Sequence, residues 1–95
     1  MSQKTYAYKK IITTSTSEGV EGLPRLRNLT VFNNGAAAVK IECDNPIDSG
    51  STSLTLNPNA SFTYDFPVDK LYHVAASGTP ELYLLGARQF QEDPS

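Results

Sequence analysis

Hydrophobic and polar residues alternate with a period of two along most of this chain. In the clearest stretch, Val39, Ile41 and Cys43 are separated by two charged residues. Because successive side chains of a β-strand point to opposite faces of the sheet, this pattern predicts a half-buried strand. Segments 71–76 and 81–87 are more continuously apolar, which predicts central strands covered on both faces. Further strands are predicted at residues 29–33, 54–56 and 62–66.

Turn-forming residues separate these segments. The tripeptide Asn-Asn-Gly at residues 33–35 favours positive φ, which predicts a tight hairpin that pairs strand 29–33 directly with strand 36–43. Residues 57–60 place a proline at the first corner of a second tight turn. No segment has a helical period, so nothing supplies the crossover helices of a parallel sheet. The sequence therefore predicts an all-β fold, a small antiparallel β-sandwich or barrel of about six to seven strands with an extended N-terminal arm.

The chain divides by composition into three parts. Residues 1–27 fit an N-terminal arm that ends in a strand able to join a sheet edge, either its own or a neighbour's. A first strand inside the sandwich fits the same residues equally well. Residues 28–88 form the sandwich body, and residues 89–95 form a polar, acidic C-terminal tail. With 95 residues in all, the chain has the length of one domain.

Charge is distributed unevenly along the chain. Five basic and two acidic residues give residues 1–27 a net charge of +3, whereas three basic and eight acidic residues give the remainder −5. A basic arm on an acidic body predicts contact with an acidic partner or with another copy of the protein. Scattered solvated charge is the simpler alternative. The five cations form no dense patch, so nucleic acid is not predicted as a partner.

The arm also holds the candidate binding residues. Tyrosine combines a large contact area with a polar tip, which suits interfaces, and an arm has no core of its own for its tyrosines to fill. Together with the nearby cations they form the predicted partner-binding set. The candidate residues are Tyr6, Tyr8, Lys9, Lys10, Arg25 and Arg27.

Residues able to carry catalysis are scarce. The chain has one histidine, His73, and one cysteine, Cys43, and both lie inside predicted strands with no third group to orient them. A histidine on a sheet face and a small core cysteine are the simpler interpretation. The sequence therefore predicts that the protein is not an enzyme and has no catalytic residue.

Ligand sets for metals and cofactors are incomplete as well. Structural zinc requires four Cys or His ligands, and a blue-copper site requires two histidines. Residues 44–48 collect carboxylate and amide oxygens, but they lack the alternating acidic spacing of a calcium loop, so turn capping is the preferred interpretation. The glycines occur singly and form no phosphate-binding loop. We therefore expect neither a metal nor a cofactor.

The N-terminus and the apolar segments bear on the compartment. No apolar run is long enough to cross a bilayer, so the sequence predicts no membrane contact. The first residues are polar and aromatic and form no apolar signal region, which predicts synthesis in the cytosol. A single cysteine excludes an intramolecular disulfide, and this suits a reducing compartment.

Three segments and a closing strand carry a resemblance to a known class of proteins. A strand ends in Asn-Asn-Gly at residues 31–35, Leu-x-Leu-x-Pro-x-x-Ser-Phe spans residues 54–62, and Leu-Tyr-x-Val-Ala-Ala-Ser-Gly-Thr spans residues 71–79, before the apolar strand at 82–85. This order resembles the small β-sandwich structural proteins of tailed bacteriophages, namely head decoration, cement or minor virion proteins. The resemblance covers about residues 28–87, and Asn59 stands where glycine is usual; Asn also tolerates the left-handed conformation.

The resemblance implies a virion structural protein, made in the host cytoplasm and located in the virion. It implies a capsid cement or decoration protein that clamps neighbouring subunits by binding the major capsid protein or another virion protein, as a homo-oligomer, either a trimer or a dimer. One alternative is a tail, neck or spike module of the virion. Another is a carbohydrate-binding β-sandwich that uses Tyr64, Tyr72 or Tyr83 as its platform.

Overall fold

The computed structural model describes residues 3–47 and 53–91, and in these residues it contains seven β-strands and no helix. All the strand pairs are antiparallel, so the predicted all-β antiparallel fold class is confirmed. The strands are β1 (Gln3–Thr13), β2 (Gly19–Asn33), β3 (Val39–Cys43), β4 (Leu54–Leu56), β5 (Ser61–Thr63), β6 (Val68–Ala75) and β7 (Glu81–Gln91).

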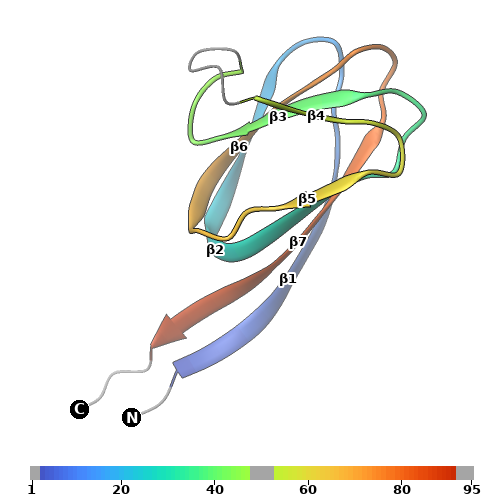
Figure 1. Ribbon diagram of the computed structural model, residues 1–95. Coiled ribbons are helices and arrows are strands. Elements are labelled where there is room, and N and C mark those ends of the chain that lie inside the picture. Colours follow the sequence, from blue (N-terminus) through green and yellow to red (C-terminus); the bar gives the residue numbers. More distant parts are fainter. Residues whose placement is uncertain (1–2, 48–52, 92–95) are drawn as a thin grey trace.

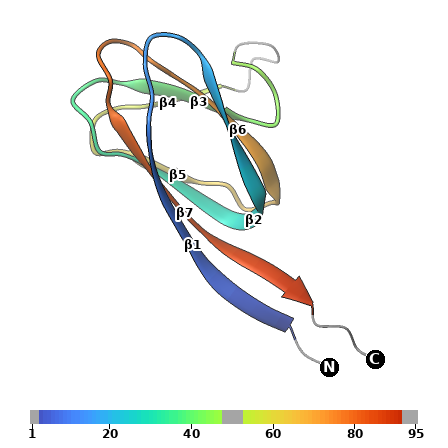
Figure 2. The same cartoon turned by 180° about the vertical axis from the view of Figure 1, so that it is seen from behind.

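The longest strand, β2, belongs to two sheets. Its first part, residues 19–26, pairs with β6, and its second part, residues 27–33, pairs with β7 and β5. Sheet 1 therefore has the strand order β1-β7-β2-β5, and sheet 2 has the order β2-β6-β3-β4. The two ends of this arrangement, β4 and β5, face each other across the interior (Figures 1 and 2). The fold is thus a small β-sandwich that is joined through β2.

A bulge explains how β2 passes from one sheet to the other. Leu26 and Leu29 are both fully buried, although they are three residues apart, and the two residues between them are exposed. Asn28 has a φ of 56°, the left-handed conformation that asparagine tolerates better than most residues. Because a bulge adds one residue and increases the local twist, the strand leaves sheet 2 and enters sheet 1 with its apolar residues still facing inward.

Alternate residues of both sheets form one hydrophobic core. In β7, Leu84 is fully buried while the next residue, Leu85, is 41% exposed. The prediction that segments 71–76 and 81–87 are covered on both faces is therefore wrong, because each strand is central in its sheet but has one outward face. The buried apolar residues are Ile12, Leu26, Leu29, Val31, Val39, Ile41, Leu56, Tyr64, Val68, Leu71, Ala75, Leu82 and Leu84.

The predicted hairpin at residues 33–35 is wrong. β2 and β3 do not pair; the chain crosses from sheet 1 to sheet 2 between them. Neither Asn34 nor Gly35 is among the described residues with positive φ. Gly35 is needed for a different reason: a Cβ atom there would lie 2.1 Å from the Cβ atom of Pro80. Glycine thus allows two connections to approach closely at this end of the sandwich.

The buried side chain of Asn33 holds this crossing in place. Its Nδ2 donates to the carbonyl oxygens of Ala37 at 2.8 Å and Leu56 at 2.9 Å, and its Oδ1 accepts from the backbone N–H of Gly35 at 2.9 Å. The amide is fully buried, and these three bonds satisfy most of its hydrogen-bonding capacity. One side chain thereby ties the end of β2 to β4 and to the crossing segment.

The predicted turn at residues 57–60 is confirmed. The Ala60 N–H donates to the Asn57 carbonyl at 2.9 Å, and Asn59 has a φ of 68°. Proline at the second position and a left-handed residue at the third are the signature of a type II turn. The turn carries the chain from β4 in sheet 2 to β5 in sheet 1.

The N-terminal segment forms the edge strand of sheet 1. β1 pairs with β7 along its whole length, from Gln3 opposite Gln91 to Thr13 opposite Glu81. The far part of this ribbon extends beyond the rest of the molecule (Figure 1). With the ribbon included, the molecule measures 51 × 25 × 17 Å along its principal axes. The arm therefore joins its own sheet; the expected boundary at residue 27 falls within β2, and the expected tail begins within β7.

Candidate protein-binding face

The outward face of sheet 1 is identified by its strand register. In an antiparallel pair, residues that lie directly opposite each other share one face of the sheet. Ile11 on β1 lies opposite Tyr83 on β7, and Tyr83 lies opposite Phe32 on β2. Lys9 and Leu85 form the next pair on the same face. Since the neighbouring residues Ile12, Val31, Leu82 and Leu84 are all buried, this set points away from the core.

An exposed apolar cluster occupies the middle of this face. Ile11 is 48% exposed and Leu85 is 41% exposed. The rings of Phe32 and Tyr83 pack edge to face with their centroids 6.0 Å apart. These four residues lie on three adjacent strands, so their side chains form one patch. A contiguous apolar patch that contains aromatic residues is typical of a surface that another protein covers.

Polar groups surround the patch and hold its aromatic residues in place. Asn34 Nδ2 donates to the Tyr83 hydroxyl at 3.1 Å, which fixes the polar end of that ring. On the β5 side, the hydroxyls of Thr30 and Thr63 are hydrogen-bonded at 2.8 Å. Lys9 and Glu81 are exposed near its two ends along the strands. An apolar centre with a polar rim is the usual anatomy of a protein interface.

The two neighbouring lysines of the predicted set point in opposite directions. Lys9 is exposed on the outward face of sheet 1, opposite Leu85. Lys10 instead forms an ion pair with Glu21 of β2, with Nζ 2.6 Å from Oε2. The hydrogen bond and the charge of Glu21 raise the pKa of Lys10. Consecutive residues of a strand alternate between faces, so these two cations cannot form a single patch.

The other predicted binding residues are dispersed. Tyr8 is half-buried, lies opposite Gly86 and packs against the hydrophobic core. Arg27 is exposed beside the bulge, opposite Ala87 and on the same face as Lys9. Tyr6 lies in β1, and Arg25 lies within β2; their side chains are outside the described part of the structure. Of the predicted set, the structure therefore brings Lys9 and Arg27 to the candidate face.

The distribution of charge did not indicate the apolar residues of the patch, but the sequence contained another signal for two of them. Ile11 precedes Ile12, and Leu85 follows Leu84. Two consecutive apolar residues in a strand must point to opposite faces, so one of each pair has to face outward. Burial settles which one: Ile12 and Leu84 enter the core, and their neighbours form the patch.

The lone histidine is part of the core structure. His73 is 7% exposed, and its Nδ1 lies 2.9 Å from the Oγ1 of the buried Thr14. Burial lowers the pKa of His73, although the nearby carboxylates of Glu21 and Glu18 act in the opposite direction. The hydrogen bond joins β6 to the chain just after β1 and helps to hold this edge of the sandwich together.

The lone cysteine has the properties of a core residue. Burial, with the neighbouring charges of Asp44 and Glu42, raises the pKa of the Cys43 thiol. A nucleophilic cysteine needs the reverse shift, because the thiolate is the reactive form. The hydrogen bond of the His73 ring goes to Thr14, so the ring is engaged elsewhere.

Residues 44–47 cap a strand junction. The Asp44 carboxylate accepts the backbone N–H groups of Asp69 at 3.1 Å and Lys70 at 2.9 Å, which joins the end of β3 to the start of β6. This agrees with capping as the preferred interpretation of the loop; Asp48 lies outside the described residues. Among the residues that the structure describes, no group of three His, Cys, Asp or Glu side chains is placed to hold a metal ion.

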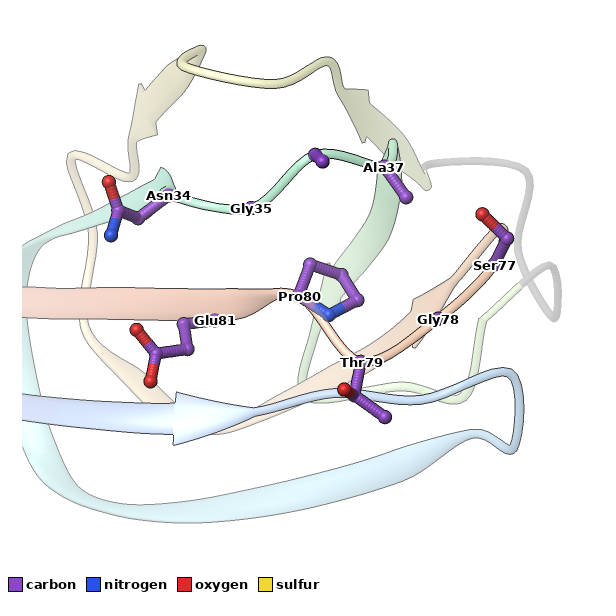
Figure 3. A pocket seen from close by; sticks show the side chains of 9 residues that line it. Asn34, Gly35, Ala37, Ser77, Gly78, Thr79, Pro80 and Glu81 are labelled. Atoms are coloured by element: carbon purple, nitrogen blue, oxygen red, sulfur yellow. The ribbon is translucent and has the colours of Figure 1, made fainter.

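A cleft at one end of the sandwich has few chemical groups to offer. It has a volume of about 380 Å³ and lies between the crossing at residues 34–37 and the connection at residues 77–81. Figure 3 shows the Pro80 ring between these two segments, with Glu81 and Thr79 on the side of residues 77–81. Small side chains and backbone form most of its lining, and none of the described residues that line it is aromatic.

The tyrosines proposed for carbohydrate binding do not form one surface. Tyr64 is 6% exposed and belongs to the core. Tyr72 lies opposite Val20 on the outward face of sheet 2, whereas Tyr83 lies on the outward face of sheet 1. The three tyrosines are therefore separate candidates, and of the three only Tyr72 and Tyr83 lie on an outward face.

Within the described residues there is no helix with the length and apolarity needed to cross a bilayer. Comparisons with protein-family models, with curated proteins and with solved structures found no match to this chain. The resemblance to phage virion proteins consequently rests on the sequence segments alone, and the candidate site rests on geometry.

Proposed function

We propose that this protein is a non-enzymatic structural protein that binds a protein partner through the outward face of sheet 1. The observation that carries the proposal is the outward apolar patch on β1, β7 and β2, in which Ile11 and Leu85 are exposed and Phe32 and Tyr83 are half-buried. The sequence resemblance supplies the setting, which is a virion. There the protein acts as a capsid cement or decoration protein and clamps neighbouring capsid subunits.

The size of the patch predicts how binding is achieved. Full burial of a leucine or isoleucine side chain contributes about 1.5–3 kcal/mol, so Ile11 and Leu85, which are 48% and 41% exposed, contribute about 1 kcal/mol each when a partner covers them. A single contact of this kind is weak. Many copies on a regular lattice, or a homo-oligomer with several such faces, convert modest contacts into firm attachment through avidity.

The test is the number of copies in a purified particle. Virions of the phage whose genome encodes this chain are purified, and the ratio of this protein to the major capsid protein is measured by quantitative mass spectrometry. A cement protein is expected in a fixed ratio to the capsid lattice. A few copies per particle would instead identify a tail, neck or spike component, and absence from the particle would contradict the virion proposal.

Direct attachment is tested with capsids that lack the protein. Purified protein is mixed with such capsids and sedimented, and the bound fraction is measured against concentration. We expect saturable binding and a higher temperature of capsid disruption once the protein is bound. Capsids that neither bind the protein nor gain stability would contradict the cement function.

A further inference from the structure

Three aromatic side chains gather at the edge of the sandwich where β5 of sheet 1 faces β4 of sheet 2. Phe62 lies in β5, and Tyr64 and Phe66 follow it at intervals of two residues. The Phe62 and Tyr64 rings meet edge to face with centroids 5.0 Å apart, and the Tyr64 and Phe66 rings do the same at 5.7 Å. The central ring is buried, whereas Phe62 is 38% exposed and Phe66 is 47% exposed.

These rings line a cavity that opens between the two sheet edges. Its volume is about 390 Å³. None of the described residues that line it is basic. The lining residues are Glu42, Cys43, Asn45, Leu54, Phe62, Tyr64 and Phe66.

The cavity lies in a negative electrostatic potential. Burial raises the pKa of the Tyr64 hydroxyl, and the charges of Cys43, Glu42 and Asp44 raise it further. The same two carboxylates, together with burial, raise the pKa of the Cys43 thiol. Glu42 is 2% exposed, and its Oε1 accepts a hydrogen bond from Ser53 Oγ at 2.6 Å. Glu42 therefore places a buried carboxylate in the wall of the cavity.

Aromatic rings and negative potential together favour one kind of guest. A cation is attracted to the face of an aromatic ring, and the attraction is stronger where water is excluded. The methylene groups of a lysine or arginine side chain also pack against apolar walls while the charged end stays polar. A neutral apolar side chain as the guest would contact the rings and Leu54, but it would have no electrostatic attraction to the carboxylates.

The neighbouring backbone shows how such a side chain can be delivered. In the described residues, β4 pairs only with β3, and β5 pairs only with β2, so both are edge strands. An extended segment of another protein can lie along such an edge and direct alternate side chains into the gap. A free small cation cannot form backbone hydrogen bonds with an edge strand. The exposed strand edges therefore favour a protein segment as the occupant.

We propose that the cavity between β4 and β5 receives a lysine or arginine side chain from an extended segment of a partner protein. This site is separate from the outward face of sheet 1 and does not depend on it. The aromatic rings of Phe62 and Phe66 contact the guest's stem and cation, and the carboxylate of Glu42 in the cavity wall favours its positive end.

The test compares two capped pentapeptides that differ only at the central residue, lysine in one and norleucine in the other. Norleucine keeps the apolar stem and lacks the charge. Each peptide is titrated into the ¹⁵N-labelled full chain, and amide shifts are followed at residues 42–45 and 62–66. We expect the lysine peptide to bind about fivefold more tightly, the ratio that corresponds to about 1 kcal/mol for a cation–aromatic contact.

Two variants locate the binding. Phe66→Leu keeps an apolar side chain but removes an exposed ring, and it is expected to bring the lysine peptide to the affinity of the norleucine peptide. Val20→Thr, on the β2 edge of sheet 2, is the matched control and is expected to leave the affinities of both peptides unchanged. Because the peptide comparison uses the unaltered chain, the test stands even if a variant loses its fold.

Equal affinities for the two peptides, or shifts confined to other residues, would overturn the proposal. Binding of the lysine peptide that Phe66→Leu leaves unchanged would overturn it as well. None of these results bears on capsid attachment through sheet 1, so failure here and failure of the proposed function are distinguishable.

Discussion

The outward faces of the two sheets differ in where their charges lie. In sheet 2 the central strands carry exposed charges at Lys70 of β6 and Lys40 of β3, which lie among the apolar residues Val20, Tyr72 and Val74 of the same face. In sheet 1 the central strands β7 and β2 carry Leu85, Tyr83, Thr30 and Phe32 there, and charges lie at the margins.

This difference is the reason why we propose the outward face of sheet 1 as the binding face. A solvated antiparallel sheet usually buries its apolar residues and presents polar ones. Sheet 2 follows that rule more closely, because charge interrupts its outward face. Sheet 1 departs from it where its strands are central, and the departure is not required by the core, since Leu82 and Leu84 already fill the interior. The fold does not need this apolar patch, and a patch of this kind is typical of a surface that binds a partner, as we propose for sheet 1.

The largest expected effect separates stability from binding within two adjacent residues. Leu84→Ala removes a fully buried side chain and is expected to lower the free energy of unfolding by about 3 kcal/mol. Leu85→Ala removes an outward side chain and is expected to lower it by less than about 1 kcal/mol. Urea denaturation followed by circular dichroism measures both. Equal losses of unfolding free energy in the two variants would show that Leu85 also stabilises the core. That result would contradict the assignment of Leu85 to the outward face.

The next effect concerns pH and is expected in stability alone. Burial holds the pKa of folded His73 below its usual value, so at neutral pH the ring is mostly uncharged in both states and the shift has little effect on stability. As pH falls through about 6.5, the unfolded state binds a proton first, and stability declines by up to about 1.4 kcal/mol per pH unit until the folded pKa is reached.

The control for this effect is His73→Asn, which keeps a polar atom near Thr14 but does not titrate in this range. Urea denaturation between pH 5 and pH 7.5 is expected to show the decline in the unaltered chain and a flatter profile in the variant. Partner binding over the same range should follow neither curve, because His73 lies on the inward side of sheet 2. Binding that titrates with His73 would link the two regions and contradict their independence.

The smallest expected effect distinguishes two neighbouring lysines. Lys9→Glu reverses a charge at the rim of the patch and is expected to weaken partner binding about threefold to tenfold at low salt, and less at high salt. Lys10→Glu, on the opposite side of β1, is expected to leave binding unchanged. Association rates measured at two salt concentrations decide between these outcomes. Equal effects would indicate that net charge, and not the face, determines binding.

Much of the fold follows from short-range sequence patterns. Alternation located β3, β4 and the core residues of β2, because the period of two is a local property of extended chain. The turn at residues 57–60 was predictable because proline and asparagine act on their own backbone dihedrals. Strand pairing was less accessible. The Asn-Asn-Gly segment fits a hairpin locally, and only the distant Pro80 and the carbonyl of Leu56 explain why the chain crosses to the other sheet there.

The candidate site was less predictable than the fold. Charge directed attention to the N-terminal segment, which contains Lys9 and Ile11, but alternation divides its cations between two faces. The patch depends on Ile11, Tyr83 and Phe32, which come from three distant segments and meet only through the register of the sheet. Sequence can show that one residue of each apolar pair must face outward. It cannot show that these outward residues are neighbours.

The most direct test of the central claim compares matched charge insertions on the two outward faces. Ile11→Asp places a carboxylate in the patch of sheet 1, and Val20→Asp places one on an exposed valine of sheet 2, which is 53% exposed. Both proteins are tested for sedimentation with capsids that lack the protein. We expect Ile11→Asp to weaken binding at least about 30-fold, because a buried unpaired carboxylate adds to the lost apolar contact. Val20→Asp should stay within about threefold of the unaltered chain. Equal binding by both variants, or a greater loss in Val20→Asp, would contradict the assignment of sheet 1 as the binding face.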